Sequence, residues 1–237
     1  MSTVDVNAFD LILFDLDGTL IETAPEICDA VNDTLRQCGL PLVTQQQVDH
    51  WIGHGTRELL VQALAFVQQT DAEAVRSSAA FAGIAWIFNG HYQLRCGTRS
   101  KPYPQVRETL QALRERGVKT AVLTNKEGRY TDIVLQAHGL DDLVDMVISG
   151  DTLSVKKPDP AGVALCLAQF GVRRERALLV GDSRIDVATA RNAGVQVWAL
   201  PYGYNMGEPI AQSAPDRVIA DCSALLAFPA HTSSVSV

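Results

Sequence analysis

The chain has 237 residues, of which 47% are hydrophobic and 20% are charged, and this composition excludes intrinsic disorder, which requires few apolar residues. Its formal charge of −7 opposes the phosphates of nucleic acids, so we expect no nucleic-acid partner. The longest nearly apolar run, residues 79–88, is too short to cross a bilayer, so we expect no membrane partner. Residues 1–10 lack the basic start of a signal peptide, and the five cysteines are scattered, which together favour a cytoplasmic protein.

Along most of the chain, short apolar runs alternate with stretches of helical periodicity. Near-continuous apolar runs of this length are typical of strands that are buried on both faces. They cover residues 11–14, 118–123, 144–148, 177–180 and 195–200. Between them, helices are predicted to end at Gly117, Gly139 and Gly171, the last with Asp159 as its N-cap. The alternation predicts right-handed β-α-β units around a mainly parallel sheet, which is an α/β fold with a Rossmann-like core.

Residues 21–100 break this alternation, because they contain no convincing strand. Helical periodicity predicts one helix over residues 25–38 and a second that starts near Thr56. A third helix is predicted to start near Thr70, because Thr70 and Glu73 have the spacing of a capping box. The interruption is therefore predicted to be entirely helical.

The organisation that follows is a core with an inserted cap. We predict that residues 1–20 and 101–237 form the α/β core and that residues 21–100 form the helical cap domain. Residues 96–104 then form the hinge through which the chain returns to the core. Residues 201–209 are punctuated by glycine and proline and are predicted to form a long loop, whose contact with the cap or with a partner subunit stays open.

Polar residues gather where the predicted strands end. In open α/β sheets, ligands bind beyond the carboxyl ends of the strands. There the chain carries Asp15, Asp17, Thr124, Asn125, Lys157, Asp182 and Ser183. Taken singly, an aspartate after a strand is often a turn former, and a lysine in a loop is usually solvated. Taken together, acidic, hydroxyl and cationic groups in one crevice predict a chemical site.

Four motifs run along the chain in order. They are Asp15-Leu16-Asp17-Gly18-Thr19-Leu20, then Thr124, then Lys157-Pro158, and last Gly181-Asp182-Ser183-x-x-Asp186. This pattern resembles the haloacid dehalogenase superfamily, in particular its phosphatases with a helical cap inserted after the first motif. Within these, residues 51–55 and 202–208 are similar to the bacterial phosphoglycolate phosphatases. The resemblance implies magnesium-dependent hydrolysis of a small phosphate monoester, 2-phosphoglycolate above all, through an aspartyl-phosphate intermediate.

Two carboxylates fit the chemistry of such a reaction. We expect Asp15 to be the nucleophile, since a carboxylate on a sharp turn can attack phosphorus, and Asp17 to protonate the leaving alkoxide and then deprotonate the attacking water. Carboxylates around a phosphate repel it, so we expect Mg²⁺, held by the side chains of Asp15 and Asp182. The resemblance adds the backbone carbonyl of Asp17. Asp186, with Ser183 beside it, is expected to hold a metal-bound water or to orient the lysine of the third motif.

A further set of residues is expected to bind the phosphoryl group. Thr124, the backbone N–H of Asn125 and Lys157 neutralise its equatorial oxygens during transfer. The resemblance favours the lysine directly before the proline of the third motif, which is Lys157. Its neighbour Lys156 is therefore expected to be solvated.

The segment Gly53-His54-Gly55-Thr56-Arg57 joins two predicted helices of the cap and is called the cap loop below. One interpretation is a plain turn between helices, with Thr56 as N-cap and Arg57 in solvent. The other is a loop that covers the active site and determines substrate specificity. In that case the backbone N–H groups of Gly55 and Thr56, with His54 or Arg57 beside them, bind a carboxylate of the substrate.

Other enzymes share parts of this pattern. A hydrolytic dehalogenase lacks the metal site and the second aspartate, so Asp17 and Asp182 argue against it. A phosphonate hydrolase needs a cap lysine for a Schiff base, and the first lysine of the chain is Lys101, which excludes it. A phosphatase for another small sugar or metabolite phosphate and a sugar phosphomutase stay open. A non-catalytic binding protein on this fold should have lost a motif residue, and none is lost. The oligomeric state also stays open.

Overall fold

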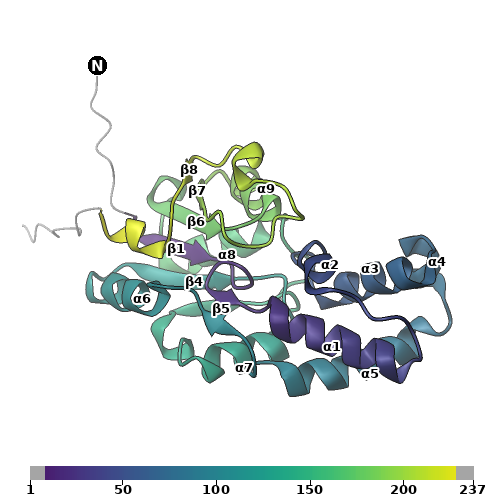
Figure 1. Cartoon of the computed structure of the whole chain (residues 1–237). Coiled ribbons are helices and arrows are strands. Elements are labelled where there is room, and N and C mark those ends of the chain that lie inside the picture. The colour runs from purple at the N-terminus through teal and green to yellow at the C-terminus, as the bar shows by residue number, and fades with distance from the viewer. Residues whose placement is uncertain (1–8, 228–237) are drawn as a thin grey trace, which may run out of the picture.

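The computed structural model describes residues 9–227 (Figure 1). Residues 1–8, most of the stretch examined for a signal peptide, and residues 228–237 lie outside this range. The described chain forms a six-stranded sheet in the order β5-β4-β1-β6-β7-β8, and every neighbouring pair runs parallel. Its strands are β1 (Leu11–Phe14), β4 (Lys119–Leu123), β5 (Met146–Ile148), β6 (Ala177–Gly181), β7 (Gln196–Ala199) and β8 (Arg217–Val218).

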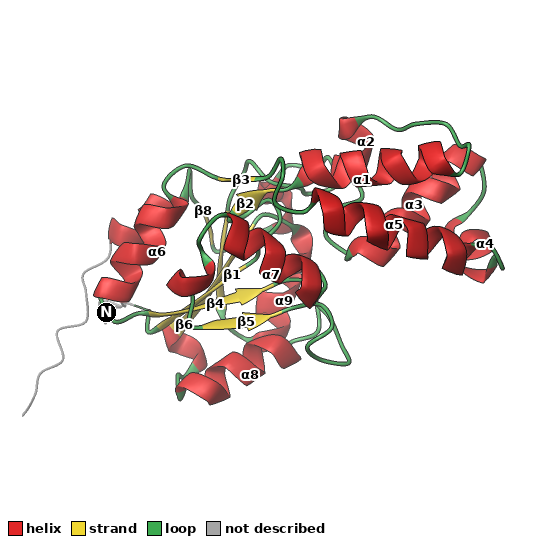
Figure 2. Cartoon of the chain, turned by 90° about the horizontal axis from the view of Figure 1, so that it is seen from below, coloured by secondary structure: helices red, strands yellow, loops and turns green. Residues whose placement is uncertain are grey.

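Different helices cover the two faces of the sheet (Figure 2). In β1, Leu11 and Leu13 point to one face while Ile12 and Phe14 point to the other, because successive side chains of a strand alternate. All four are buried, which explains the continuous apolar run in the sequence. The first face is covered by α8 (Ala161–Phe170) and α9 (Arg184–Ala193), and the second by α6 (Val106–Glu115) and α7 (Gly128–Ala137).

The predicted parallel α/β core is confirmed, with differences at the ends of elements. Helix α8 begins at Ala161 with Pro160 as its N-cap, so the prediction of Asp159 as N-cap is wrong by one residue. The carboxylate of Asp159 nevertheless accepts the N–H of Ala161 at 2.9 Å, which caps the first turn from just outside it. Strand β8 was not predicted, because its two residues are exposed and give no apolar run.

A group of helices lies to one side of the sheet (Figure 1), between β2 (Ile21–Glu22) and β3 (Lys101–Pro102). Strands β2 and β3 pair antiparallel, so the chain leaves the core and returns to it side by side. The prediction that residues 21–100 are entirely helical is therefore wrong at Ile21–Glu22, because two residues give too short an apolar run to reveal a strand. The helices are α1 (Ala24–Gln37), α2 (Gln45–Asp49), α3 (Thr56–Gln68), α4 (Ala72–Ser77) and α5 (Phe81–Arg95).

Helix α4 starts later than its predicted capping box would place it. Its N-cap is Asp71, whose Oδ1 accepts the N–H of Ala74 at 2.7 Å. The predicted capping box of Thr70 and Glu73 is therefore wrong. Aspartate and threonine are both good N-caps, so sequence spacing alone does not separate two neighbouring candidates.

Helix α5 was not predicted as a separate element, because its apolar residues do not follow one face. Phe88 and Tyr92 are buried, whereas Trp86 and Leu94 on the same helix are each 77% exposed. Such a helix lacks the polar stripe that normally reveals helical periodicity. Within residues 9–227, none of the helices combines the length and the apolar character that crossing a bilayer requires.

Candidate active site

The carboxyl ends of β1, β4 and β6 meet at one edge of the sheet, beside the helices α1–α5. Asp15 directly follows β1, and its N–H donates to the carbonyl of Val180 in β6 at 2.9 Å. Thr124 directly follows β4, and Asp182 directly follows β6. The parallel register therefore brings these three sequence-predicted residues together.

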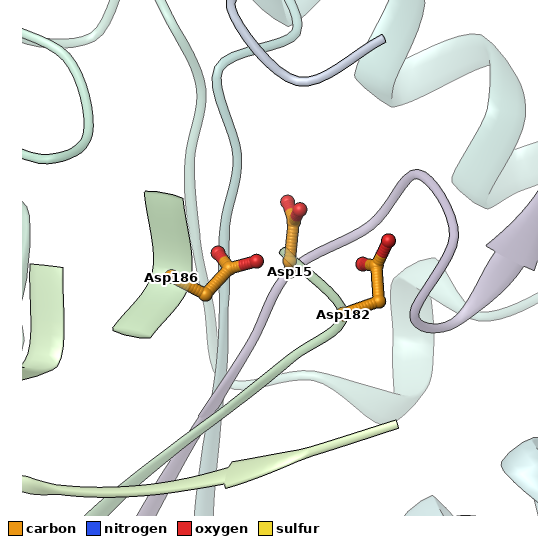
Figure 3. Close-up of side chains that lie close together, drawn as sticks. All are labelled: Asp15, Asp182 and Asp186. Atoms are coloured by element: carbon orange, nitrogen blue, oxygen red, sulfur yellow. The ribbon is translucent and has the colours of Figure 1, made fainter. Parts of the chain in front are cut away.

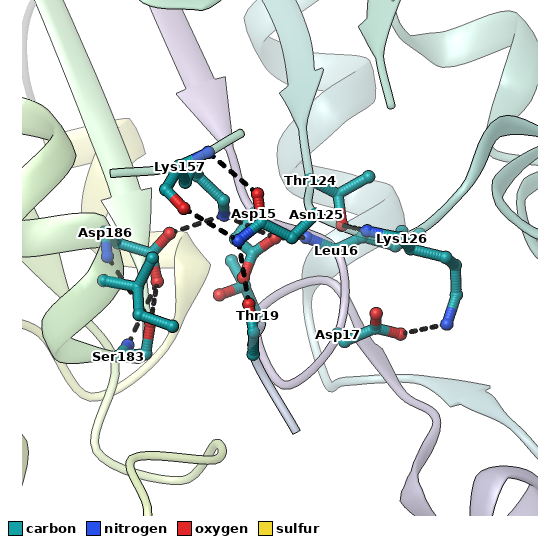
Figure 4. A network of polar contacts seen from close by, with 12 residues as sticks. Asp15, Leu16, Asp17, Thr19, Thr124, Asn125, Lys126, Lys157, Ser183 and Asp186 are labelled. Atoms are coloured by element: carbon teal, nitrogen blue, oxygen red, sulfur yellow. Dashed lines mark hydrogen bonds and ion pairs between the residues drawn. The ribbon is translucent and has the colours of Figure 1, made fainter. Parts of the chain in front are cut away.

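Asp15 and Lys157 form a buried ion pair at this edge (Figure 4). The Nζ atom of Lys157 lies 2.8 Å from Asp15 Oδ1 and 2.7 Å from Asp186 Oδ1. Burial raises the pKa of Asp15 to about 7, although Lys157 opposes the shift. Burial works to lower the pKa of Lys157, but the two carboxylates outweigh it and hold that pKa above its ordinary value. The lysine is thus a fixed cation directly beside the expected nucleophile.

Asp182 is held by neutral donors. The hydroxyl of Thr19 donates to its Oδ1 at 2.5 Å, and the backbone N–H of Tyr204 donates to its Oδ2 at 2.5 Å. Gly18, at φ 88°, allows this approach, because a Cβ at that position would lie 2.4 Å from Asp182 Oδ2. Burial, together with the nearby charges of Asp15 and Asp186, raises the pKa of Asp182 well above its usual range.

Asp186 and Ser183 form the capping box of α9. The hydroxyl of Ser183 donates to Asp186 Oδ2 at 2.6 Å, and the backbone N–H of Ser183 donates to the same oxygen at 3.1 Å. The other oxygen of Asp186 accepts from Lys157. The local motif therefore holds Asp186 rigidly, and Asp186 in turn positions Lys157.

Asp15, Asp182 and Asp186 form an acidic cluster whose carboxylate oxygens lie within 4.8 Å of one another (Figure 3). One lysine, Lys157, reaches two of these carboxylates, whereas the hydroxyl of Thr19 and the N–H of Tyr204, which donate to Asp182, carry no charge. The cluster therefore carries more negative charge than its own lysine balances. Clustered carboxylate oxygens are the ligands that Mg²⁺ prefers, so Asp15 and Asp182 fit a magnesium site.

The side chain of Asp17 lies on the other side of Asp15 from Lys157 (Figure 4). Its Oδ1 accepts from the hydroxyl of Thr23 at 2.6 Å and lies 2.8 Å from Nζ of Lys126. Lys126 is 2% exposed and also donates to the hydroxyl of Tyr92 at 2.5 Å. Sequence reasoning missed Lys126, and its position directly after Thr124-Asn125 was the available signal.

Thr124 and Asn125 are buried at the end of β4. The side chain of Asn125 connects two loops, since its Nδ2 donates to the carbonyls of Gly53 and Lys157 at 2.9 and 3.1 Å. Its Oδ1 accepts the N–H of Lys157 at 2.9 Å. Besides the backbone role expected from the sequence, Asn125 thus joins the cap loop to the lysine beside Asp15.

A cavity separates the carboxyl ends of the strands from the cap loop. Its polar lining comes mainly from the core, and its apolar lining comes from the α1–α3 region. It is lined by Asp15, Asp17, Ile27, Ile52, Gly53, Gly55, Thr56, Leu59, Thr124, Asn125 and Lys126. This arrangement places a small space, walled by aliphatic side chains, next to the expected nucleophile.

The cap loop contributes unequally to this cavity. Gly53, Gly55 and Thr56 line it, whereas His54 is exposed and lines a separate crevice. The guanidinium of Arg57 stacks over the ring of Phe81 at 4.6 Å from its centroid. The structure therefore brings the backbone of the loop to the cavity but not the His54 and Arg57 side chains.

The N-cap of the helix after the cap loop differs from expectation. The N-cap of α3 is Gly55 and not Thr56, whose hydroxyl instead donates to Glu127 Oε2 of the core at 2.6 Å. Lys156, expected to be solvated, is exposed, and its Nζ lies 3.6 Å from Glu127 Oε1 and 3.5 Å from the carbonyl of Asn125. Thr56 therefore takes part in the contact between cap loop and core.

The loop over residues 201–209 contacts the start of α1 within the same chain. The hydroxyl of Tyr204 accepts the N–H of Ala24 at 3.0 Å, and the hydroxyl of Tyr202 donates to the carbonyl of Thr19 at 3.2 Å. The same loop supplies the N–H that binds Asp182. It thus connects the acidic cluster to the start of α1.

A parallel α/β sheet with helices inserted after β1, and an acidic cluster at the strand ends, define the class of the protein. The chain belongs to the haloacid dehalogenase-like hydrolase family, whose model matches residues 12–200. The resemblance found in the four sequence motifs is confirmed.

The chain is also similar to individual proteins along most of its length. The chain is 39% identical over 217 residues to the phosphoglycolate phosphatase of Pseudomonas putida, which covers 91% of this chain and 78% of the relative. It is 39% identical over 221 residues to the phosphoglycolate phosphatase of Aliivibrio fischeri, and this match covers 92% of this chain and 95% of the relative. The crystal structure of a predicted phosphoglycolate phosphatase from Haemophilus somnus matches with a TM-score of 0.88 at 34% identity. The match covers 94% of this chain and 98% of that chain.

Proposed function

We propose that the protein is a magnesium-dependent phosphoric monoester hydrolase that converts 2-phosphoglycolate to glycolate and phosphate. The buried pairing of Asp15 with Lys157 at the end of β1, inside the acidic cluster, is the observation that carries this proposal. The names of relatives at 37–39% identity support the choice of substrate. The partner is then a small-molecule phosphate ester, and the cytoplasm is the expected location.

The first half of the reaction transfers the phosphoryl group to Asp15. An oxygen of its carboxylate attacks phosphorus, and the bond between phosphorus and the ester oxygen breaks. The carboxyl group of Asp17 gives its proton to that oxygen, so glycolate leaves as an alcohol. Asp17 lies two residues from Asp15 but on its other side, which supports separate roles for the two groups.

The second half of the reaction releases phosphate. Water attacks phosphorus of the aspartyl phosphate while the carboxylate of Asp17 accepts a proton from it. The bond between phosphorus and the Asp15 oxygen breaks, and the carboxylate of Asp15 is restored. Asp17 ends protonated, as it began, so the cycle balances.

The groups around Asp15 stabilise the charge of the transferring phosphoryl group. Lys157 supplies a fixed ammonium, and Thr124 and the backbone of Asn125 supply hydrogen-bond donors at the end of β4. Asp186 holds Lys157 in place by its 2.7 Å contact. Such donors act strongly because they are already oriented before the reaction and are shielded from water.

The side chains of Asp15 and Asp182, with the backbone carbonyl of Asp17, would hold Mg²⁺. The ion, when bound, neutralises phosphate oxygens and orients the ester for attack. The uncompensated charge of the acidic cluster supports this assignment. Asp186 is already engaged by Lys157 and Ser183, which supports a role in positioning over a role in direct coordination.

Residues 21–100 are proposed to act as a cap domain on a core of residues 1–20 and 101–237. The antiparallel β2–β3 ribbon and residues 96–104 form the connection on which such a cap would move. The cap loop reaches the core through the contacts of Gly53 and Thr56. Closure would exclude bulk water while the phosphorus is attacked.

A panel of phosphate esters tests this function. It contains 2-phosphoglycolate, glucose phosphates, pyridoxal phosphate and nucleotides, each assayed with Mg²⁺ and with a chelator. We expect the highest kcat/KM for 2-phosphoglycolate and no activity after chelation. Better hydrolysis of another ester, movement of phosphate between two positions of a sugar, or no hydrolysis at all would contradict the proposal.

A further inference from the structure

Lys126 is a buried cation that the chemistry described above does not use. It lines the cavity next to Asp15 and is 2% exposed. Among the described residues that line this cavity, Lys126 is the only lysine or arginine. Burying an ammonium is costly unless it is paired, and Lys126 is paired with Asp17 at the wall of this small cavity.

The ammonium of Lys126 is held in one orientation. Asp17 Oδ1 lies 2.8 Å from its Nζ, the hydroxyl of Tyr92 lies 2.5 Å from it, and the ring of Tyr92 lies 5.1 Å away. An ammonium carries three N–H donors, and these two partners within residues 9–227 occupy two of them. The third remains for a ligand in the cavity. Glu26, whose charge also acts on Lys126, accepts the N–H of Ser100 with Oε2 at 3.0 Å, and its buried Oε1 has no hydrogen-bond partner within residues 9–227.

The two buried lysines of the site lie on opposite sides of Asp15 (Figure 4). Lys157 contacts the nucleophile, where the phosphoryl group must bind, and Lys126 contacts Asp17, where the leaving oxygen must be protonated. A substrate that spans from one lysine to the other therefore presents its leaving group to Lys126. A leaving group with a negative charge close to the ester oxygen matches this arrangement.

We propose that Lys126 forms the binding site for a carboxylate on the leaving group and so determines the preference for carboxylated phosphate esters. This inference rests on the proposed phosphatase function and names the group that selects the substrate. In 2-phosphoglycolate one methylene separates the ester oxygen from the carboxylate, so the carboxylate stays close to Asp17 and its partner Lys126. Gly55 and Thr56 line the same cavity at the start of α3, and the unpaired N–H groups of its first turn add donors for the anion.

Two esters that differ in one group provide the test. Ethyl phosphate has the skeleton of 2-phosphoglycolate with a methyl group in place of the carboxylate. The kcat/KM for both esters is measured with the wild-type protein, with Lys126→Met and with the control Lys156→Met. Lys156 is an exposed lysine close to the same loop, and it does not line the cavity. We expect Lys126→Met to lower kcat/KM for 2-phosphoglycolate by about 100-fold more than for ethyl phosphate, because it removes a buried charge partner.

The result with Lys156→Met should be an unchanged ratio between the two esters. Equal losses on both esters with Lys126→Met would overturn the inference, because Lys126 would then only position Asp17. Failure of the wild-type protein to prefer 2-phosphoglycolate would overturn the proposed substrate itself, and that outcome is visible without any variant.

A milder variant covers the case in which Lys126→Met fails to fold. Tyr92→Phe keeps the buried ring and the lysine and removes only the hydroxyl that anchors the ammonium. We expect this change to lower the ratio of kcat/KM between 2-phosphoglycolate and ethyl phosphate by about 5-fold. An unchanged ratio would argue against a carboxylate site at Lys126.

Discussion

The core and the cap loop face the same cavity but contribute different kinds of groups. In the core, Asp182, Asp186 and Lys157 are buried, and each is held by at least two polar contacts. The cap loop contributes backbone at Gly53 and Gly55 and no charged side chain. The difference teaches that the core holds its charged groups in place, while the loop lines the cavity with backbone; under the proposed function, the core then fixes the reacting groups and the loop shapes the space around the substrate. Changes in the core should therefore affect the rate more than changes in the loop.

The largest expected effect follows from removing the nucleophile. Asp15→Asn keeps the size of the side chain and removes the attacking oxygen, so we expect kcat to fall by about 10⁴-fold or more. Steady-state assays with 2-phosphoglycolate measure the loss, and thermal melting checks the fold. A variant that folds and retains a near-normal rate would show that the core chemistry is assigned to the wrong residue.

The next effect concerns the magnesium site. Chelation should abolish activity and Mg²⁺ should restore it, and Asp182→Ala should raise the Mg²⁺ concentration for half-maximal rate by about 10–100-fold. The exposed Asp141 gives a matched control, and Asp141→Ala should leave that concentration unchanged.

Ca²⁺ should inhibit, because its looser coordination misplaces the nucleophile. Full activity after exhaustive chelation would exclude a metal-dependent core.

A third effect is a dependence of stability on pH. The pKa of Asp15 rises from 3.8 to about 7 on folding without metal, so the folded state binds more protons between these values. The contribution of this group to the free energy of unfolding must therefore fall as pH rises from about 4 to 7. We expect Asp15→Asn to raise Tm relative to wild type by about 5 °C more at pH 8 than at pH 5 in a chelator. Calorimetry that finds the same difference at both pH values would contradict the burial of this charge.

The smallest effects belong to the cap loop. Thr56→Val removes the hydroxyl that donates to Glu127, and we expect kcat/KM to fall by about 10-fold through weaker closure. Arg57→Ala affects a side chain that stacks on Phe81 outside the cavity, and we expect less than a 2-fold change, of roughly the size typical for surface substitutions. A larger loss with Arg57→Ala than with Thr56→Val would mean that the loop acts through its side chains.

The sequence predicts the core better than the cap for a physical reason. Buried parallel strands appear as apolar runs, and the residue after each run, such as Asp15 or Thr124, falls at the edge where ligands bind. The position of Lys126 depends on packing against Tyr92 of α5, and the lack of a polar face on α5 hid that helix. The direction of the Arg57 side chain likewise depends on a tertiary contact, with Phe81, which spacing does not encode.

The central claim is that Asp15 carries the phosphoryl group during turnover. The direct measurement mixes protein, Mg²⁺ and 2-phosphoglycolate, quenches with acid during turnover, reduces with borohydride and maps the peptides by mass spectrometry. An aspartyl phosphate is reduced to homoserine, so the account predicts homoserine at position 15 in the wild-type protein and none in Asp15→Asn. Homoserine at a different aspartate, or none despite a pre-steady-state burst of glycolate, would contradict the account.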